Sequence, residues 1–135
     1  MSIAAVYQGR PLSSILLFAI DDDFTLYFAT HTDSFKSKAL MENPLVSLSV
    51  WSQGEMLVQA DGNAQVVKDA ATCDQILVKL SNSAVGIENF WPPVLRIRDS
   101  SGYTVFQIKL HWLRVLDLHS DTITAKELPF TEIAV

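Results

Sequence analysis

The sequence predicts a mainly β protein, built as a closed or nearly closed antiparallel barrel of six or so strands with two short helices. Three observations support this prediction. Short runs of strand-forming residues are separated by turn signals, two helical segments follow good N-cap residues, and no regular alternation of strands and helices suggests a parallel sheet. The 135 residues, 49% of them apolar, suffice for one full hydrophobic core, so residues 1–135 are expected to form a single domain.

The first predicted strand, Ser13 to Ile20, is a short apolar run rich in strand formers that follows Pro11. The acidic triplet Asp21-Asp22-Asp23 after it is predicted to be a hairpin turn, because Asp tolerates turn geometry and bonds its own backbone. Phe24 to His31 then supplies the returning strand. Three adjacent carboxylates in a strand-end turn cannot converge on one ion, so turn chemistry is favoured over a metal site.

A first helix is predicted from Phe35 to Glu42, and three good N-cap residue types, Thr, Asp and Ser, come directly before it. Helical spacing places Phe35, Ala39 and Leu40 on one apolar face. Asn43-Pro44 ends the helix, because the residue before a proline is pushed out of the helical region.

Two strands and a second helix are predicted next. Val46 to Val50 alternates apolar residues with serine, as a half-buried strand does, and Glu55 to Lys68 is a longer strand with Gly62 as a bulge or bend. Asp69 is the predicted N-cap of a second helix that ends at Ser81-Asn82-Ser83. The residues expected on its apolar face are Cys73, Ile76, Leu77 and Leu80.

The C-terminal part is predicted to return to strands. Pro92-Pro93 breaks the chain, Val94 to Arg98 forms a short strand, and Asp99 to Gly102 forms a turn. A long strand region covers Tyr103 to Leu118, and a last short strand is expected around Ile123.

Composition argues against several classes of function. The net charge of −5 and the lack of any run of Lys or Arg argue against binding to nucleic acid or to an anionic membrane surface. There is no basic-then-apolar leader and no long apolar stretch, so the expected location is the cytoplasm. A single cysteine, Cys73, rules out an internal disulfide framework and is expected to pack as a small hydrophobe.

The turn from Thr30 to Lys36 has the composition of an anion site. It offers hydroxyl groups, the free amides of a helix N-terminus and the positive charge of Lys36 within one turn. The residues by themselves leave an alternative open, in which Thr32, Asp33 or Ser34 only caps the helix and Lys36 points to solvent.

A resemblance favours the anion site. The residues that carry it are Phe28-Ala29-Thr30, Ser34, Lys36, Leu40, Asn43-Pro44 and the strand Ser47 to Trp51. In this order they resemble the F-x-T-x(3)-S-x-K-x(3)-L-x(2)-N-P stretch of the pyridoxamine 5′-phosphate oxidase-like FMN-binding split-barrel family. The resemblance covers about Ser13 to Lys68, and Gly62 falls where that family has a glycine.

The resemblance implies a six-stranded antiparallel split β-barrel with two short helices, a homodimer, and one FMN in each of two clefts between subunits. It also implies a flavin-dependent oxidoreductase that acts on a small molecule, which the sequence does not identify. Ser34 and Lys36 match positions that bind the flavin phosphate, and Ala29 and Thr30 match positions that line the cofactor. The main chain of Leu16, Leu17 and Phe18 would run beside the isoalloxazine ring.

Several positions depart from the pyridoxamine 5′-phosphate oxidases themselves. Ser14, Ala19 and Phe35 stand where those enzymes have cations, Leu57 stands about where they have a flavin-contacting glutamine, and the C-terminal Arg-x-His motif is absent. These departures argue against the vitamin oxidase activity. They also leave two alternatives: a non-catalytic dimeric module that binds a flavin or haem, and a dimeric scaffold without a cofactor.

The histidines and tryptophans add little. His31, His111 and His119 have no metal-ligand spacing with one another, so no metal site is expected, and no Ser-His-Asp arrangement suggests hydrolysis. The tryptophans, which could stack on a flavin, are expected instead in the core or at an interface. They are Trp51, Trp91 and Trp112.

Overall fold

The computed structural model describes residues 1–84, 102–119, 121, 123, 124, 126 and 128–135. The predicted break at Pro92-Pro93, the predicted strand Val94 to Arg98 and most of the turn before Gly102 lie outside the described residues. Within them the elements, in chain order, are β1 (Ser2–Tyr7), β2 (Arg10–Ile15), β3 (Ala19–Ile20), β4 (Leu26–His31), α1 (Phe35–Glu42), β5 (Leu45–Ser52), β6 (Met56–Val66), α2 (Ala70–Ser83), β7 (Tyr103–Asp117) and β8 (Thr131–Ile133).

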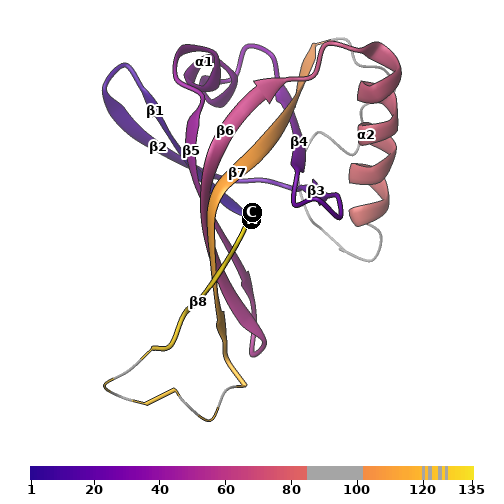
Figure 1. Cartoon of the computed structure of the whole chain (residues 1–135). Helices are drawn as coiled ribbons and strands as arrows, with labels where there is room; N and C mark the ends of the chain where they lie inside the picture. The colour runs from indigo at the N-terminus through magenta and orange to yellow at the C-terminus, as the bar shows by residue number, and fades with distance from the viewer. Residues whose placement is uncertain (85–101, 120, 122, 125, 127) are drawn as a thin grey trace.

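The strands form one strongly curved antiparallel sheet in the order β2-β1-β5-β6-β7-β4-β3 (Figure 1). The long strand β7 pairs with β6 along one edge. Its other edge pairs first with β4 and further on with β8. This architecture confirms the predicted mainly β split-barrel class, although the described residues form eight strands rather than six.

The N-terminal hairpin of β1 and β2 accounts for part of this difference. Residues Gln8 and Gly9 connect its strands with φ angles of 50° and 73°. Two successive residues with positive φ are typical of a two-residue hairpin turn, for which Asn-Gly is the strong sequence signal. Gln-Gly is a weaker signal, so this hairpin was not predicted from the sequence.

The predicted continuous strand Ser13 to Ile20 is wrong. Strand β2 ends at Ile15, β3 begins at Ala19, and the residues between them form a connection without strand structure. Leu16 packs in the main core of the barrel, whereas Leu17 packs against a second apolar cluster. A short apolar run can belong to a buried strand or to a buried connection, and periodicity does not separate the two.

Strand β4 is covered on both faces, and this explains its apolar sequence. Leu26 and Phe28 face the main core, where Phe28 stacks on Phe106 with ring centroids 5.3 Å apart. Tyr27 and Ala29 alternate with them and pack against the second cluster. Helix α2 covers that face of β4 (Figure 1), so β4 lies between the barrel interior and α2.

Helix α2 confirms the predicted N-cap and apolar face. The Asp69 carboxylate accepts a hydrogen bond from the Thr72 amide at 2.8 Å, which satisfies one of the free donors at the helix start. Four residues of the helix belong to the second cluster or pack against it, as expected: Cys73, Ile76, Leu77 and Leu80.

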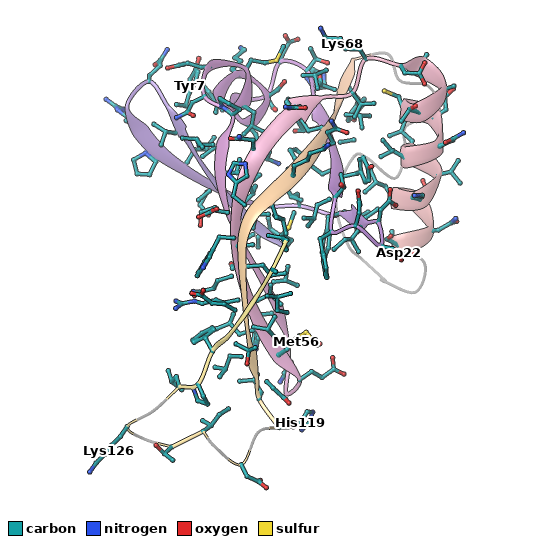
Figure 2. The ribbon with its side chains drawn as sticks, viewed as in Figure 1. Tyr7, Asp22, Met56, Lys68, His119 and Lys126 are labelled. Carbon is teal, nitrogen blue, oxygen red and sulfur yellow. The ribbon has the colours of Figure 1, made fainter. Side chains whose placement is uncertain are left out.

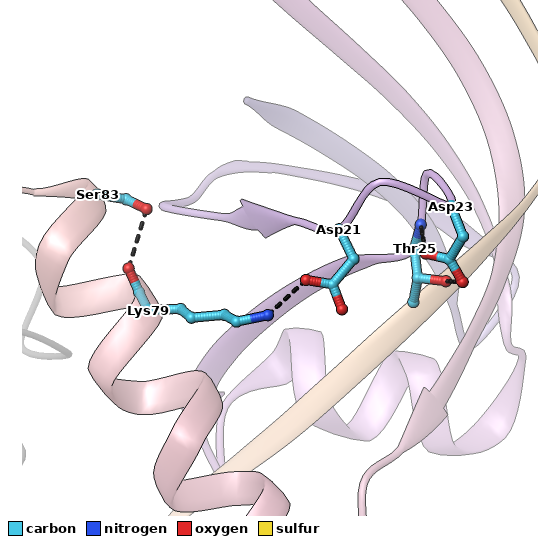
Figure 3. A network of polar contacts seen from close by, with 5 residues as sticks. All are labelled: Asp21, Asp23, Thr25, Lys79 and Ser83. Atoms are coloured by element: carbon cyan, nitrogen blue, oxygen red, sulfur yellow. Dashed lines mark hydrogen bonds and ion pairs between the residues drawn. The ribbon is translucent and has the colours of Figure 1, made fainter.

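The predicted acidic turn between β3 and β4 is also confirmed. Asp23 accepts hydrogen bonds from the amide and the hydroxyl of Thr25, both at 3.0 Å. Asp21 forms an ion pair with Lys79 of α2 at 2.5 Å, which links this turn to the helix (Figure 3). Both side chains of the pair are at least partly exposed, so the pair contributes little stability, and the apolar contacts of α2 hold the helix in place.

Helix α1 has the predicted bounds, but its predicted apolar face is only partly correct. Ala39 and Leu40 are buried in the main core, together with the side chain of Ser37. Phe35 is 68% exposed, with its ring 5.8 Å from the ring of Tyr7, which lies beside α1 in Figure 2. Because α1 closes one end of the barrel, only a narrow stripe of the helix reaches the core.

Two further predictions concern β6 and the C-terminal strand. The register of β6 against β7 shifts between Asp61 and Gly62, which confirms the predicted bulge. The expected strand around Ile123 is wrong, since the last strand is β8, Thr131–Ile133. None of the helices in the described residues has the length and hydropathy to span a lipid bilayer.

Candidate functional site

The polar turn between β4 and α1 is held by contacts with the start of β7. The Thr32 amide donates a hydrogen bond to the Gly102 carbonyl at 2.9 Å, and the hydroxyls of Thr32 and Thr104 lie 3.1 Å apart. The turn therefore presents its hydroxyl and amide groups from a fixed position at the α1 end of the barrel.

Thr30 and Ser34 are brought together, as the sequence led us to expect. Their hydroxyl oxygens lie 3.1 Å apart, and the Ser34 hydroxyl also accepts a hydrogen bond from the Ser37 amide at 3.1 Å. Ser34 is thus the N-cap of α1 and part of a hydroxyl pair. The cap alone would fit an ordinary helix start, so the case for a ligand depends on the neighbouring donors.

Two main-chain donors and one cation remain unused at this helix start. Within the described part of the chain, the amides of Phe35 and Lys36 have no hydrogen-bond partner, and the Lys36 ammonium has no carboxylate partner. Lys36 is half-buried, whereas Lys38 is exposed. Burial lowers the pKa of Lys36 below its usual value, because removal from water disfavours the charged form.

The segment Leu16 to Phe18 offers main-chain groups rather than a shared wall of side chains. The Leu16 amide is bonded to the Met1 carbonyl at 3.0 Å. The amides and carbonyls of Leu17 and Phe18 have no hydrogen-bond partner among the described residues. Both residues are partly exposed, so these groups could bond water or a polar ligand.

The predicted site residues therefore fall into three places. The turn holds Thr30, Ser34 and Lys36, whose polar groups the helix start brings together. Leu17 and Ala29 pack against the cluster beneath α2. The side chains of the remaining two, Leu16 and Phe18, pack in the barrel interior.

An apolar cavity of about 320 Å³ was not anticipated from the sequence. Phe18 is the only residue of the predicted site that lines it. The other described lining residues come from six strands, from Met1 ahead of β1 and from Phe24 ahead of β4, so no local pattern marks them. No group of three His, Cys, Asp or Glu side chains in the described residues could hold a metal ion.

On the outer face of the sheet, Arg114 has neutral partners. Its guanidinium donates two hydrogen bonds to the Gln59 side chain, at 2.8 and 2.6 Å, and lies 4.2 Å from the ring of Phe130. Trp112, expected in the core or at an interface, is half-buried beside it, with its ring 5.2 Å from the guanidinium. These contacts hold Arg114 away from the polar turn, so it does not replace the cations missing there.

Comparison with known proteins places these features in context. A protein-family model described as pyridoxamine 5′-phosphate oxidase matches residues 1–117 of the chain. No curated protein gives a significant match.

Several solved structures share the fold. A pyridoxamine 5′-phosphate oxidase-related, FMN-binding protein from Nostoc punctiforme is 13% identical, with a TM-score of 0.64 over 99% of this chain and 85% of that one. An F420 reductase is 21% identical, with a TM-score of 0.65 over 83% and 86% of the two chains. PhzG from Burkholderia lata, in complex with tetrahydrophenazine-1-carboxylic acid, is 16% identical, with a TM-score of 0.66 over 99% and 81%. At these identities the likeness establishes the fold.

Proposed function

The chain belongs to the pyridoxamine 5′-phosphate oxidase family, and from this premise we propose that it is an oxidoreductase that binds FMN. The observation that carries the proposal is the half-buried Lys36, which has no acidic partner among the described residues and lies in the first turn of α1. Partial burial makes a cation without an anion less stable than in water, and a bound phosphate would offset that cost.

The phosphate end of FMN would lie at the start of α1. The amides of Phe35 and Lys36 and the hydroxyls of Thr30 and Ser34 supply hydrogen-bond donors, and Lys36 supplies a full charge. The N-terminus of a helix favours an anion through its free amides and its dipole, so these groups act in the same direction.

The ring end of FMN would lie along residues Leu16 to Phe18. The amides and carbonyls of Leu17 and Phe18, which no described residue bonds, are suited to the polar edge of an isoalloxazine, which carries both donors and acceptors. When bound, the flavin supplies the redox chemistry, and the protein supplies position and electrostatics. No side chain of the predicted site is a candidate general acid or base.

Oxidation of pyridoxamine 5′-phosphate itself is disfavoured. Ser14, Ala19 and Phe35 provide no charge at the positions where the vitamin oxidases have cations, and Ala19 is buried beneath α2. A substrate that is itself phosphorylated would need cations beyond Lys36. We therefore propose a different small-molecule substrate.

The direct test is to purify the protein and examine its colour and absorption spectrum. The expected result is a yellow protein with a flavin spectrum, from which denaturation releases FMN. A colourless protein that does not take up added FMN would refute the proposal. If FMN is bound, reduction by a nicotinamide cofactor would distinguish an oxidoreductase from a carrier that holds the flavin without turning over a substrate.

We also propose that the protein is a homodimer, on the basis of the outer face of the sheet. Large apolar side chains are exposed there on β1, β2 and β5, namely Val6, Ile15, Leu45 and Trp51, the last 67% exposed. Strand alternation puts them on one face, because the residues between them are buried inside the barrel. Small uncharged residues, among them Ala4, Ser47 and Ser49, lie between them on this face, so a second copy could cover it without burying a charge there.

The change Trp51→Glu is expected to weaken the dimer about tenfold or more, because a charge would replace an aromatic side chain that the dimer would bury. Light scattering over a range of concentrations should show the wild-type chain at twice its 15.0 kDa mass and the variant shifted toward the monomer. Val78 of α2 is 60% exposed away from this face, so Val78→Glu is the control. A wild-type monomer at all concentrations would contradict the proposal.

FMN binding is expected to weaken at alkaline pH. The pKa of Lys36 lies below its ordinary value of 10.5, so its ammonium, which would pair with the phosphate, is lost as the pH rises through that lowered pKa. Fluorescence titrations with FMN between pH 7 and pH 10 would measure the effect. The Lys36→Arg variant should show a smaller alkaline loss, since arginine stays charged; equal losses in both proteins would argue against Lys36.

A further inference from the structure

The apolar cavity lies toward the end of the barrel opposite α1. Met56, which lines it, lies near the turn between β5 and β6, whereas Tyr7 lies beside α1 at the other end (Figure 2). Its volume of about 320 Å³ falls within the range of small-molecule sites, roughly 300 to 1,000 Å³.

The chemistry of the lining is uniform. All fourteen of its described residues have apolar side chains, and they include Phe18, Leu26, Val58 and Leu113. Met1, also in the lining, carries the N-terminal ammonium, which donates a hydrogen bond to the Leu16 carbonyl at 3.3 Å. Among the described lining residues there is no charged or hydroxyl side chain that could hold water by hydrogen bonds. Water in such a space is poorly stabilised, and apolar cavities of this kind bind apolar molecules instead.

The mouth of the cavity is also apolar. Four large side chains that line it are between 38% and 50% exposed, namely Ile20, Phe24, Met56 and Ile133. They come from β3, from the turn before β4, and from the ends of β6 and β8, so the fold gathers them from distant parts of the chain. Exposed apolar area costs roughly 25 cal/mol per Å², so a ligand that covered this mouth would gain binding free energy from it.

We propose that this cavity binds an uncharged, apolar small molecule. A charged ligand would lose its hydration without gaining a partner in the lining. A peptide is disfavoured for the same reason, since each residue would bring an amide and a carbonyl into a space whose side chains cannot bond them. A compact hydrocarbon or aromatic ring system has neither a charge to dehydrate nor peptide groups left without hydrogen bonds.

The cavity shares Phe18 with the segment along which we propose that the flavin ring lies. A ligand in the cavity would therefore lie close to the flavin, and an apolar substrate class follows. This last step rests on the proposed function, whereas binding in the cavity does not need a flavin.

The test uses the uncharged dye N-phenyl-1-naphthylamine, whose fluorescence rises in apolar surroundings. Titration of the protein is expected to show one saturable site per chain. Val58 lines the cavity, so Val58→Phe should fill it and weaken dye binding about tenfold or more. The control, Val78→Phe on exposed helix α2, makes the same change outside the cavity and should bind as wild type does.

A second pair of variants tests the cavity if the Val58→Phe protein does not fold. Met56→Glu places a charge at the mouth and should weaken dye binding, whereas Met41→Glu, on α1 away from the cavity, should not. If the cavity variant folds but binds the dye as well as its control variant does, the inference is overturned. Dye binding by the monomer alone, and not by the dimer, would also overturn it. FMN titration of the same proteins reports separately on the flavin, so a protein that binds dye but not FMN would refute the proposed function and leave the cavity site standing.

Discussion

Replacing Lys36 by alanine should weaken FMN binding about 10- to 100-fold, which corresponds to the loss of one charge-assisted hydrogen bond of about 1.5–3 kcal/mol. Lys36 supplies the positive charge of the polar turn. It is half-buried and has no acidic partner in the described residues. Its loss would leave the phosphate with the helix amides and the hydroxyls of Thr30 and Ser34, which carry no full charge.

The matched control is Lys38→Ala, two residues further along the same helix. Lys38 is exposed, so its charge is screened by water and should contribute little to FMN binding. FMN dissociation constants from fluorescence quenching, with circular dichroism to confirm that both variants fold, would measure the difference. Equal effects of the two substitutions would remove Lys36 from the phosphate site.

The change Gly62→Ala should destabilise the fold by about 3 kcal/mol, at the upper end of what overpacking usually costs. A Cβ atom at Gly62 would lie 2.3 Å from the main-chain carbonyl oxygen of Lys109 in the neighbouring strand β7. Backbone cannot move aside as a flexible side chain can, so β6 and β7 would have to separate at the bulge.

Urea unfolding followed by circular dichroism would measure this loss. Gln65→Ala, on the same strand but with an exposed side chain, is the control. It removes one long hydrogen bond, which Gln107 donates to the Gln65 side chain at 3.3 Å, and should change the free energy of unfolding by less than about 1 kcal/mol. A Gly62→Ala protein as stable as the control would mean that the bulge tolerates a side chain.

The elements that the sequence predicted well carry their signals within a few residues. The caps at Ser34 and Asp69 and the stop at Asn43-Pro44 act locally, and both helices begin where these residues indicate. The acidic turn after Ile20 and the bulge at Gly62 depend on local backbone chemistry in the same way. Distant contacts do not alter such preferences much, so these predictions agree with the structure.

The predictions that were wrong concern apolar runs and faces. Ser13 to Ile20 was apolar enough for a strand, yet its middle is a connection that packs on both sides. Phe35 was expected in the core and is exposed, because α1 meets the barrel only along a narrow stripe. The chemistry of an apolar residue indicates that it prefers burial, and the surrounding elements decide whether it is buried.

The same distinction applies to the candidate site. The sequence by itself determined which groups meet at the polar turn, because Thr30, Ser34 and Lys36 are joined by a short loop and one helical turn. Only the tertiary structure decided that Lys36 is half-buried and has no acidic partner in the described residues. It also decided that no described residue bonds the main-chain groups of Leu17 and Phe18. It alone also assembled the apolar cavity, since burial and cavity shape arise from packing between segments far apart in the chain.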